Sequence, residues 1–254
     1  MLAYDIQGGG PGLVLLHGTS STGAGSWGTL LDALAADHTV VMPDLPGSGK
    51  SPLPDGPLDV DTVADQVVAA AREAGLSEFV VAGASLGAAL AIRVASRHPE
   101  SVRGLATVVG FARPRTTLRL NLEMWASLCA RGDENLGTYL TALSFSEDYL
   151  AGLPPQAVQQ VVDQFGGHPA PGTAEQIALT LGIDVREDLA RIAVPTLVVS
   201  ATSDRFVAPE HSLELADGIA DARLVAVSGG HAAVFEDPGP TRDALIGYLA
   251  TLRG

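Results

Sequence analysis

The chain has 254 residues, 46% of them hydrophobic, and carries 15 Lys and Arg against 29 Asp and Glu side chains, a formal net charge of −14. Its length allows one large domain or two small ones, and its hydrophobic content excludes a disordered or fibrous chain. The acidic balance leaves no basic stripe to neutralise phosphates, so we expect no nucleic-acid and no membrane partner. The single cysteine, Cys129, excludes an intramolecular disulfide and a cysteine-based zinc cluster, and we interpret it as a small apolar residue of a helix.

The amino-terminal stretch, residues 1–6, has neither the basic nor the apolar region of a secretory signal peptide. The sequence also has no run of about 18 apolar residues, which a helix crossing a bilayer would require. We therefore expect a cytoplasmic protein.

Short apolar runs rich in β-branched residues alternate with longer helical patterns along most of the chain. The runs that predict strands buried on both faces are 13–16, 39–42, 79–82, 102–109, 196–199 and 223–227. The patterns that predict helices are 26–36, 59–74, 86–98, 208–217 and 239–252. This alternation predicts an α/β fold with a mostly parallel sheet and helices on both faces. The glycine-rich segment 8–12 predicts a hairpin turn.

The alternation breaks between residues 111 and 186, where the strand signals vanish. Helical patterns punctuated by Pro and Gly replace them, at 116–130, 135–143, 155–165 and 173–181. A helical insertion between two strands of one sheet usually covers a site at the edge of that sheet. We therefore predict a core formed by 1–110 and 187–254, with a helical lid, 111–186, inserted after the strand near 102–109.

The segment Gly83-Ala84-Ser85-Leu86-Gly87 is a Gly-x-Ser-x-Gly motif between a predicted strand and a predicted helix. A serine on such a tight turn projects its hydroxyl at the carboxyl edge of the sheet, and the glycines allow close backbone approach on both sides. Ser85 could instead be a simple turn residue, but the flanking strand and helix disfavour that alternative. We predict that Ser85 is a catalytic nucleophile.

A serine hydroxyl is a weak nucleophile that needs a base, and the base needs an orienting acid. His231 follows the predicted strand 223–227, and Asp204 follows the predicted strand 196–199. Both therefore lie at the edge of the sheet where Ser85 lies. We predict that Ser85, Asp204 and His231 form a catalytic triad.

Other interpretations of the acid and the base stay open. Asp204 could be the N-cap of the helix predicted at 208–217, and His231 could be a plain loop histidine. Asp217 and Asp221 are weaker candidates for the acid, because neither directly follows a strand.

The segment 17–20 also follows a predicted strand and could supply an oxyanion hole. The backbone N–H of Thr19 could pair with that of Leu86, the first residue after Ser85, to stabilise a developing negative charge. We interpret His17 as a structural residue that holds this loop. The remaining histidines are expected to be solvated helix-end or loop residues: His38, His98, His168 and His211. No cluster has metal-ligand spacing, and no loop fits a phosphate, so we expect no metal and no cofactor.

Several of these segments together carry a family resemblance. They are His17-Gly18, the run from Pro43 to Ser51, Gly83–Gly87, Pro195-Thr196-Leu197-Val198, Asp204 and Gly230-His231. In this order and spacing they resemble the α/β-hydrolase superfamily, in the cap-bearing branch of esterases, haloperoxidase-like enzymes, enol-lactonases and carbon–carbon bond hydrolases. The resemblance implies a Ser–acid–His order along the chain and a lid inserted after the sixth strand of the family's scheme.

The sequence departs from the family pattern at two places. The family usually has another strand before the region of residues 4–6, so this sheet is expected to lack its first edge strand. The glycine usual before the acid is replaced by Ala201, which we expect to be tolerated.

The predicted lid holds six of the twelve aromatic residues of the chain. We predict that Phe111, Trp125, Tyr139 and Phe145 bind substrate in an apolar pocket, with Tyr149 and Phe165 nearby. The alternative is that a small helical lid needs large side chains simply to pack. Three arginines near the lid entrance could receive a substrate carboxylate or could be solvated: Arg113, Arg115 and Arg119.

These residues predict a serine hydrolase that cleaves an ester, lactone or thioester of a small apolar acyl or aryl substrate through an acyl-enzyme on Ser85. One alternative is an acyltransferase or thioesterase that acts on a carrier-bound acyl group, with an acyl carrier protein as partner. Another is a non-catalytic, ligand-binding member of the fold. The sequence leaves the substrate and the oligomeric state open.

Overall fold

Seven strands form one sheet in the computed structural model, which describes residues 1–167 and 169–252. They are β1 (Tyr4–Gly8), β2 (Gly12–Leu16), β3 (Thr39–Pro43), β4 (Phe79–Ala84), β5 (Val102–Val108), β6 (Thr196–Ala201) and β7 (Ala222–Val227). Their order across the sheet is β1-β3-β2-β4-β5-β6-β7, and every pair except β1 with β3 is parallel. The expected mostly parallel sheet is confirmed.

The predicted hairpin at residues 8–12 is wrong. β1 pairs antiparallel with β3, with Tyr4 opposite Pro43, and β2 pairs with the other side of β3, so β1 and β2 are not neighbours. Gly8 has a φ of 82°, and a Cβ there would lie 2.3 Å from the carbonyl oxygen of Ala35, so it serves a close approach to the end of a helix. β1 lies at the edge of the sheet with no strand outside it among the described residues, as expected from the missing family strand.

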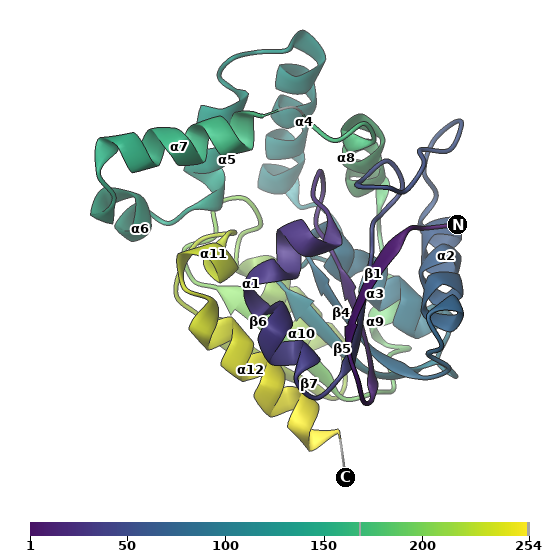
Figure 1. The fold of residues 1–254 in the computed structure, drawn as a ribbon. Helices are drawn as coiled ribbons and strands as arrows, with labels where there is room; N and C mark the ends of the chain where they lie inside the picture. Colours follow the sequence, from purple (N-terminus) through teal and green to yellow (C-terminus); the bar gives the residue numbers. More distant parts are fainter. Residues whose placement is uncertain (168, 253–254) are drawn as a thin grey trace.

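Helices cover both faces of the sheet (Figure 1), which confirms the expected layering. On one face lie α1 (Gly23–Ala35) and α12 (Pro238–Thr251), whose apolar side chains form one buried cluster with the sheet. On the other lie α2 (Val60–Glu73), α3 (Leu86–Arg97) and α10 (Glu210–Gly218). The short helix α11 (Ala233–Glu236) precedes α12. Predicted and observed helix ends agree to within about three residues.

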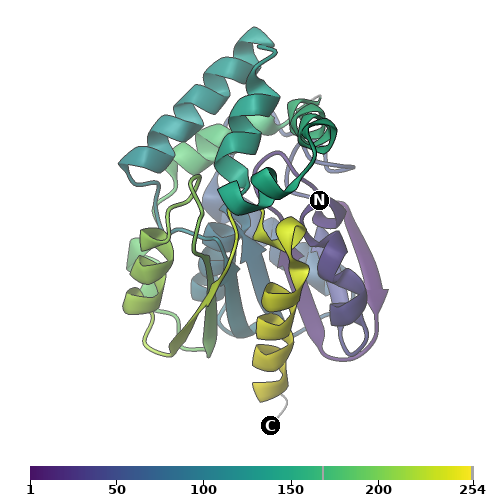
Figure 2. The ribbon, with the colours of Figure 1, turned by 90° about the vertical axis from the view of Figure 1, so that its left-hand side faces the viewer.

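The segment between β5 and β6 consists of helices joined by loops and has no strand among its described residues. It contains α4 (Thr116–Arg131), α5 (Leu136–Ser144), α6 (Glu147–Gly152), α7 (Pro155–Gly166), α8 (Thr173–Gly182) and α9 (Arg186–Leu189). Figures 1 and 2 show α4 to α8 beyond one end of the sheet, whereas α9 lies back against the core. We refer to residues 111–186 as the helical insertion. α6 was not predicted from the sequence.

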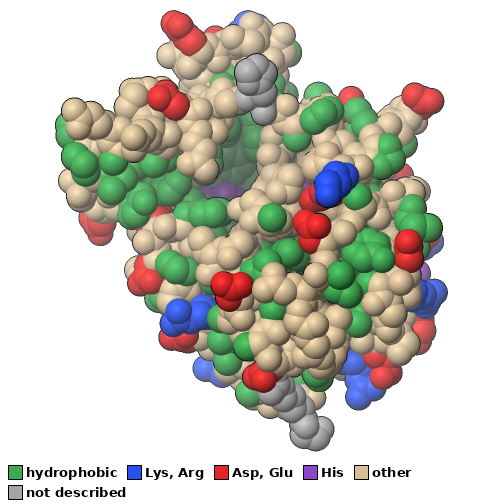
Figure 3. All heavy atoms as spheres, in the orientation of Figure 1, with side chains coloured by type: hydrophobic (Ala, Val, Ile, Leu, Met, Phe, Trp, Pro, Cys, Tyr) green, Lys and Arg blue, Asp and Glu red, His purple; other side chains and the backbone are tan. Residues whose placement is uncertain are grey.

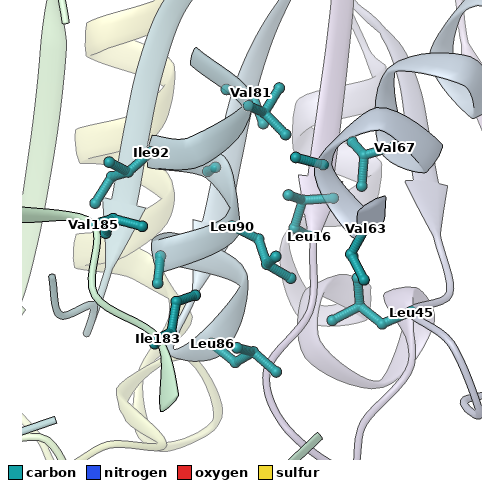
Figure 4. Close-up of a cluster of buried hydrophobic side chains, with 14 of the residues drawn as sticks. Leu16, Leu45, Val63, Val67, Val81, Leu86, Leu90, Ile92, Ile183 and Val185 are labelled. Atoms are coloured by element: carbon teal, nitrogen blue, oxygen red, sulfur yellow. The ribbon is translucent and has the colours of Figure 1, made fainter. Parts of the chain in front are cut away.

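The end of the helical insertion is fixed to the core. Ile183 and Val185 leave α8 and lie beside Leu86, Leu90 and Ile92 of α3 in the buried cluster of Figure 4. The N–H of Val185 also donates to the carbonyl of Ala112, at 2.9 Å. The insertion therefore leaves and re-enters the core at neighbouring points.

Two of the histidines expected to be solvated are buried instead. His211 on α10 receives the N–H of Arg115 on its Nε2 at 3.2 Å and contacts the carbonyl of Ala208 through Nδ1, and His38 is also buried. His38 lies between α1 and β3, and His211 lies in the first turn of α10. A position near the end of a helix therefore did not imply an exposed side chain. His98 is half-buried and contacts Asp65, while His168 lies outside the described residues.

None of the helices in the described part of the chain is both long and apolar enough to cross a membrane. Cys129 is a free, half-buried thiol on α4 that packs against the core, in agreement with its interpretation as a small apolar helix residue.

Candidate active site

Ser85 stands between the last residue of β4 and the first residue of α3, in a strained conformation. Its φ is 55° and its ψ is −117°. A Cβ on Gly83 would lie 2.0 Å from the carbonyl oxygen of Gly87, and one on Gly87 would lie 2.4 Å from that of Leu16. Only glycine fits at either position, so the two glycines of the motif allow the sharp turn that presents Ser85.

Backbone strain concentrates around one cavity. The non-glycine residues with a positive φ in the described part of the chain are Ser20, Ser85 and Val109, with φ values of 60°, 55° and 46°. All three line the same cavity, although they come from the ends of three different strands. Each such residue costs on the order of 1–3 kcal/mol, and such strain clusters at functional sites.

Asp204 and His231 form a hydrogen-bonded pair at the edge of this cavity. The Oδ2 of Asp204 lies 2.7 Å from the Nδ1 of His231, and its Oδ1 accepts the N–H groups of Phe206 and Val207 at 2.9 and 2.8 Å. The carboxyl group of Asp204 is buried and acts as a hydrogen-bond acceptor. It therefore favours the tautomer of His231 that carries the proton on Nδ1, which leaves Nε2 as an acceptor. The ring of Phe206 stacks on that of His231, with centroids 5.3 Å apart.

The competing interpretations of the acid do not match the structure. α10 begins at Glu210 and its N-cap position is Pro209, so Asp204 does not cap that helix. Asp217 and Asp221 are both exposed and neither lines the cavity.

The loop after β2 approaches Ser85 from the opposite side. A Cβ on Gly18 would lie 3.3 Å from the Cβ of Ser85, and Thr19 lines the cavity. Leu86 is the first residue of α3, so its N–H has no acceptor within the helix. Thr19 thus lines the cavity and Leu86 follows Ser85 in the chain, and their role as an oxyanion hole stays a prediction.

His17 is a neutral structural residue. Its side chain is fully buried, with Nδ1 2.7 Å from the carbonyl oxygen of Gly18 and Nε2 accepting the N–H of Leu45 at 2.8 Å. Burial lowers the pKa of His17 to about 4. The ring thus joins the loops after β2 and β3 and does not face the cavity as a second base.

The cavity has a volume of about 630 Å³ and opens between the sheet edge and the helical insertion. Figure 3 shows the hollow, with hydrophobic side chains around it and a histidine at its floor. Its described lining contains no Lys, Arg, Asp or Glu. The site therefore suits an uncharged, largely apolar molecule.

Of the four lid aromatics predicted to bind substrate, two line the cavity. Trp125 and Phe145 do, together with Tyr149 and Phe165. Phe111 does not, because it is fully buried in the core with its ring against His211. Tyr139 turns away as well, because its hydroxyl donates to the carbonyl of Asn121 at 3.1 Å.

Several lining aromatics come from outside the lid and were not predicted. They are Trp27, Phe206 and Phe235. Phe206 could have been found, because it lies two residues after Asp204 in the same loop. Trp27 lies on α1 and Phe235 on α11, and no local signal points either of them toward the site.

Glu236 is a further residue that sequence reasoning missed. Its Oε1 accepts the N–H of Gly230 at 2.9 Å and that of Ser146 at 2.7 Å, and its Oε2 accepts the Ser146 hydroxyl at 2.5 Å. The N–H of Ala232 donates to the carbonyl of Ser144 at 2.7 Å. The loop that carries His231 is thus bonded to the helical insertion.

The three arginines near the lid entrance lie outside the cavity lining. The guanidinium of Arg119 donates to the carbonyl of Leu181 at 3.0 Å, and that of Arg115 to the carbonyl of Glu210 at 3.5 Å. Their contacts do not favour a role in binding a substrate carboxylate. Within the described residues, no group of three or more His, Cys, Asp or Glu side chains could hold a metal ion.

Comparison with known proteins places the chain in a family. Residues 11–238 match the model of the alpha/beta hydrolase fold, so the chain belongs to the α/β-hydrolase family. It is 34% identical to pyrrolizixenacetamide deacetylase of Xenorhabdus hominickii, over 93% of this chain and 90% of that protein. It is 29% identical to the pimeloyl-[acyl-carrier protein] methyl ester esterase of Xanthomonas oryzae, over 98% of both chains. The expected family is confirmed.

A solved structure agrees with the fold. The chain superimposes on a thermophilic esterase from Thermogutta terrifontis with a TM-score of 0.87 and 22% identity, covering 100% of this chain and 94% of that one. The similarity therefore extends over the helical insertion as well as the sheet.

Proposed function

We propose that the protein is a serine hydrolase that cleaves an ester, lactone or thioester of a small, uncharged, apolar acyl or aryl compound through an acyl-enzyme on Ser85. The observation that carries this proposal is the Asp204–His231 pair, 2.7 Å apart, whose histidine lines the same apolar cavity as the strained Ser85. The relatives named as a deacetylase and an esterase support the same class of reaction.

The reaction has two halves. The Nε2 of His231 takes the proton of Ser85 while the Ser85 oxygen attacks the acyl carbonyl, and Asp204 stabilises the imidazolium that forms. The amides of Thr19 and Leu86 donate to the oxyanion, and His231 then returns its proton to the leaving group. In the second half His231 deprotonates a water, whose oxygen attacks the acyl carbonyl. The bond to the Ser85 oxygen then breaks, that oxygen takes the proton back from His231, and the acid is released. No cofactor takes part in these steps.

The cavity lining supports an uncharged substrate. A carboxylate or ammonium group buried there would lose its hydration and find no charged partner among the described lining residues. Aromatic side chains from both the insertion and the core would instead contact an acyl chain or an aryl ring. The substrate's polar atoms would be confined to the bond that is cleaved.

A carrier-bound acyl group is a second candidate substrate. The Xanthomonas oryzae relative is named for a methyl ester on an acyl carrier protein, which supports this alternative. The cavity would then hold the acyl part while the carrier stays outside. Hydrolysis and transfer differ only in whether water or another nucleophile receives the acyl group, so product analysis with a labelled acyl group distinguishes them.

The proposal is tested by replacing the nucleophile. We expect Ser85→Ala to lower kcat for aryl esters of acetate, butyrate and octanoate by about 10⁴-fold or more, because the acyl-enzyme can no longer form. A fluorophosphonate probe should label the wild-type protein once per chain and should fail to label Ser85→Ala. The matched control is Ser101→Ala, a buried serine that directly precedes β5 and does not line the cavity, which should keep both properties.

Two results would contradict the proposal. Unchanged turnover by Ser85→Ala would show that another group performs the reaction. A wild-type protein that binds apolar esters but neither hydrolyses them nor reacts with the probe would instead be a ligand-binding member of the family.

A further inference from the structure

Three polar side chains share one face of α8, within the helical insertion. Thr173, Gln176 and Thr180 are spaced by three and four residues, so they line one side of the helix. All three are buried. They face the loop after β2: the hydroxyl oxygens of Thr173 and Ser20 lie 2.7 Å apart, and those of Thr180 and Thr19 lie 3.3 Å apart.

Gln176 makes the most complete set of contacts on this face. The side chain is 0% exposed, its Oε1 accepts the N–H of Ser20 at 2.8 Å, and its Nε2 donates to the carbonyl of Pro46 and the hydroxyl of Ser48, both at 2.9 Å. One buried amide therefore joins α8 to the loops after β2 and β3. Removing it would leave several buried polar groups without a partner.

These contacts act on the peptide groups that flank Thr19. A planar peptide fixes its N–H opposite its C=O, so the bond from His17 to the carbonyl of Gly18 also sets the direction of the Thr19 N–H. The bond from Gln176 fixes the next peptide, between Thr19 and Ser20. Ser20 has a φ of 60°, an unfavourable backbone conformation that the contacts to α8 hold in place.

We propose that Gln176 is a positioning residue of the oxyanion hole, and that α8 of the helical insertion completes the site by fixing the Thr19 amide through Ser20. This inference rests on the serine hydrolase function proposed above. It gives the insertion a role beyond covering the cavity. Gln176 does not line the cavity, so its effect on catalysis passes through the loop after β2.

The experiment compares Gln176→Met, which keeps the approximate shape but loses the hydrogen bonds, with the wild type. We expect kcat for an aryl ester to fall about 10- to 100-fold while KM stays within about threefold, because the amide acts on the oxyanion more than on the bound ester. The affinity for an alkyl boronic acid, which forms a tetrahedral adduct on a serine, should fall by a similar factor. The conservative variant Thr173→Val, which loses only the hydroxyl contact to Ser20, should show the same pattern with a smaller loss.

The control variant is Tyr248→Phe, which removes a hydrogen bond to the carbonyl of Pro195; neither residue lines the cavity. It should lower the thermal midpoint while kcat stays within about twofold. A folded Gln176→Met with unchanged kcat and boronic acid affinity would overturn the inference. If that variant does not fold, Thr173→Val with unchanged kcat and affinity would overturn it instead.

The proposed function has its own test in the same series. If Ser85→Ala abolishes turnover while Gln176→Met and Thr173→Val keep the wild-type turnover, only the role of Gln176 is contradicted. If Ser85→Ala keeps full turnover, the serine mechanism fails and the role of Gln176 fails with it.

Discussion

The carboxyl edge of the sheet and the helical insertion build opposite sides of the same cavity by different means. At the sheet edge, Ser85, Asp204 and His231 each lie in the loop that follows a strand, and the parallel pairing of those strands brings the loops together. In the insertion, the position of a side chain depends on how helices pack on one another. Trp125 lines the cavity from α4, whereas Tyr139 on the next helix contacts Asn121 instead.

This difference separates what is encoded locally from what is decided by tertiary packing. A motif between a strand and a helix places its serine at the end of that strand, and this placement can be recognised from the local sequence. An aromatic residue in a helical segment satisfies the same hydrophobic requirement in the core or in the cavity wall. Substitutions in the two regions should therefore differ in kind: loss of catalysis at the sheet edge, and loss of stability or altered substrate preference in the insertion, apart from the side chains of α8 that contact the loop after β2.

The largest expected effect is at the sheet edge. Asp204→Asn should lower kcat about 10⁴-fold with little change in structure, because the N–H groups of Phe206 and Val207 require an oxygen at Oδ1 and so turn the new NH₂ group toward His231. His231 would then be held in the tautomer whose Nε2 carries the proton and cannot act as a base. Steady-state hydrolysis of an aryl ester measures the loss.

Asp217→Asn is the matched control, because Asp217 is an exposed acid outside the cavity lining. Its kcat should stay within about twofold of the wild type. An Asp204→Asn variant that keeps more than about a tenth of the wild-type kcat would contradict this prediction. It would show that catalysis at the sheet edge does not require Asp204 to orient His231.

The second prediction contrasts two aromatic residues of the insertion, one buried at its start and one in the cavity wall. Phe111→Ala should destabilise the fold by about 3–5 kcal/mol, because it empties a fully buried site, and should leave the relative rates on short and long esters unchanged. Trp125→Ala should shift that preference toward bulkier acyl groups, because it enlarges the cavity. Urea unfolding and a series of esters of increasing chain length measure the two effects.

A change of ester preference in Phe111→Ala, with no change in Trp125→Ala, would reverse the assignment of these residues. Equal changes of ester preference in both variants would show that substrate selection depends on the buried Phe111 as much as on the cavity wall.

The sequence predicted most of the sheet and of its edge, and the reasons are local. Every strand except β1 is a short, mostly apolar run, and each candidate catalytic residue lies in the loop that follows such a run. The failures have non-local causes. The turn at residues 8–12 was assigned to a hairpin because no local signal shows that β3 lies between β1 and β2. Gln176 was missed because its side-chain partners lie 128 to 156 residues away in the sequence. Glu236 was missed because it joins the nearby Gly230 to Ser146, which lies 90 residues away.

The smallest expected effect concerns the pH dependence of stability at the sheet edge. Burial lowers the pKa of His17 from 6.5 in the unfolded chain to about 4 in the folded protein. Between these values the unfolded chain binds a proton that the folded protein does not, so the free energy of unfolding falls as the pH falls from 6.5 toward 4. At pH 5 the loss due to His17 should be about 2 kcal/mol relative to pH 7.

His17→Gln isolates this contribution, because glutamine does not titrate yet offers a donor toward Gly18 and an acceptor toward Leu45. Urea unfolding at pH 7 and pH 5 should show a smaller loss of stability in the variant than in the wild type, by about 2 kcal/mol. Equal losses would mean that His17 is protonated in the folded protein at pH 5. A charged ring could then not accept the N–H of Leu45, so His17 would not be a rigid, neutral link between the loops after β2 and β3.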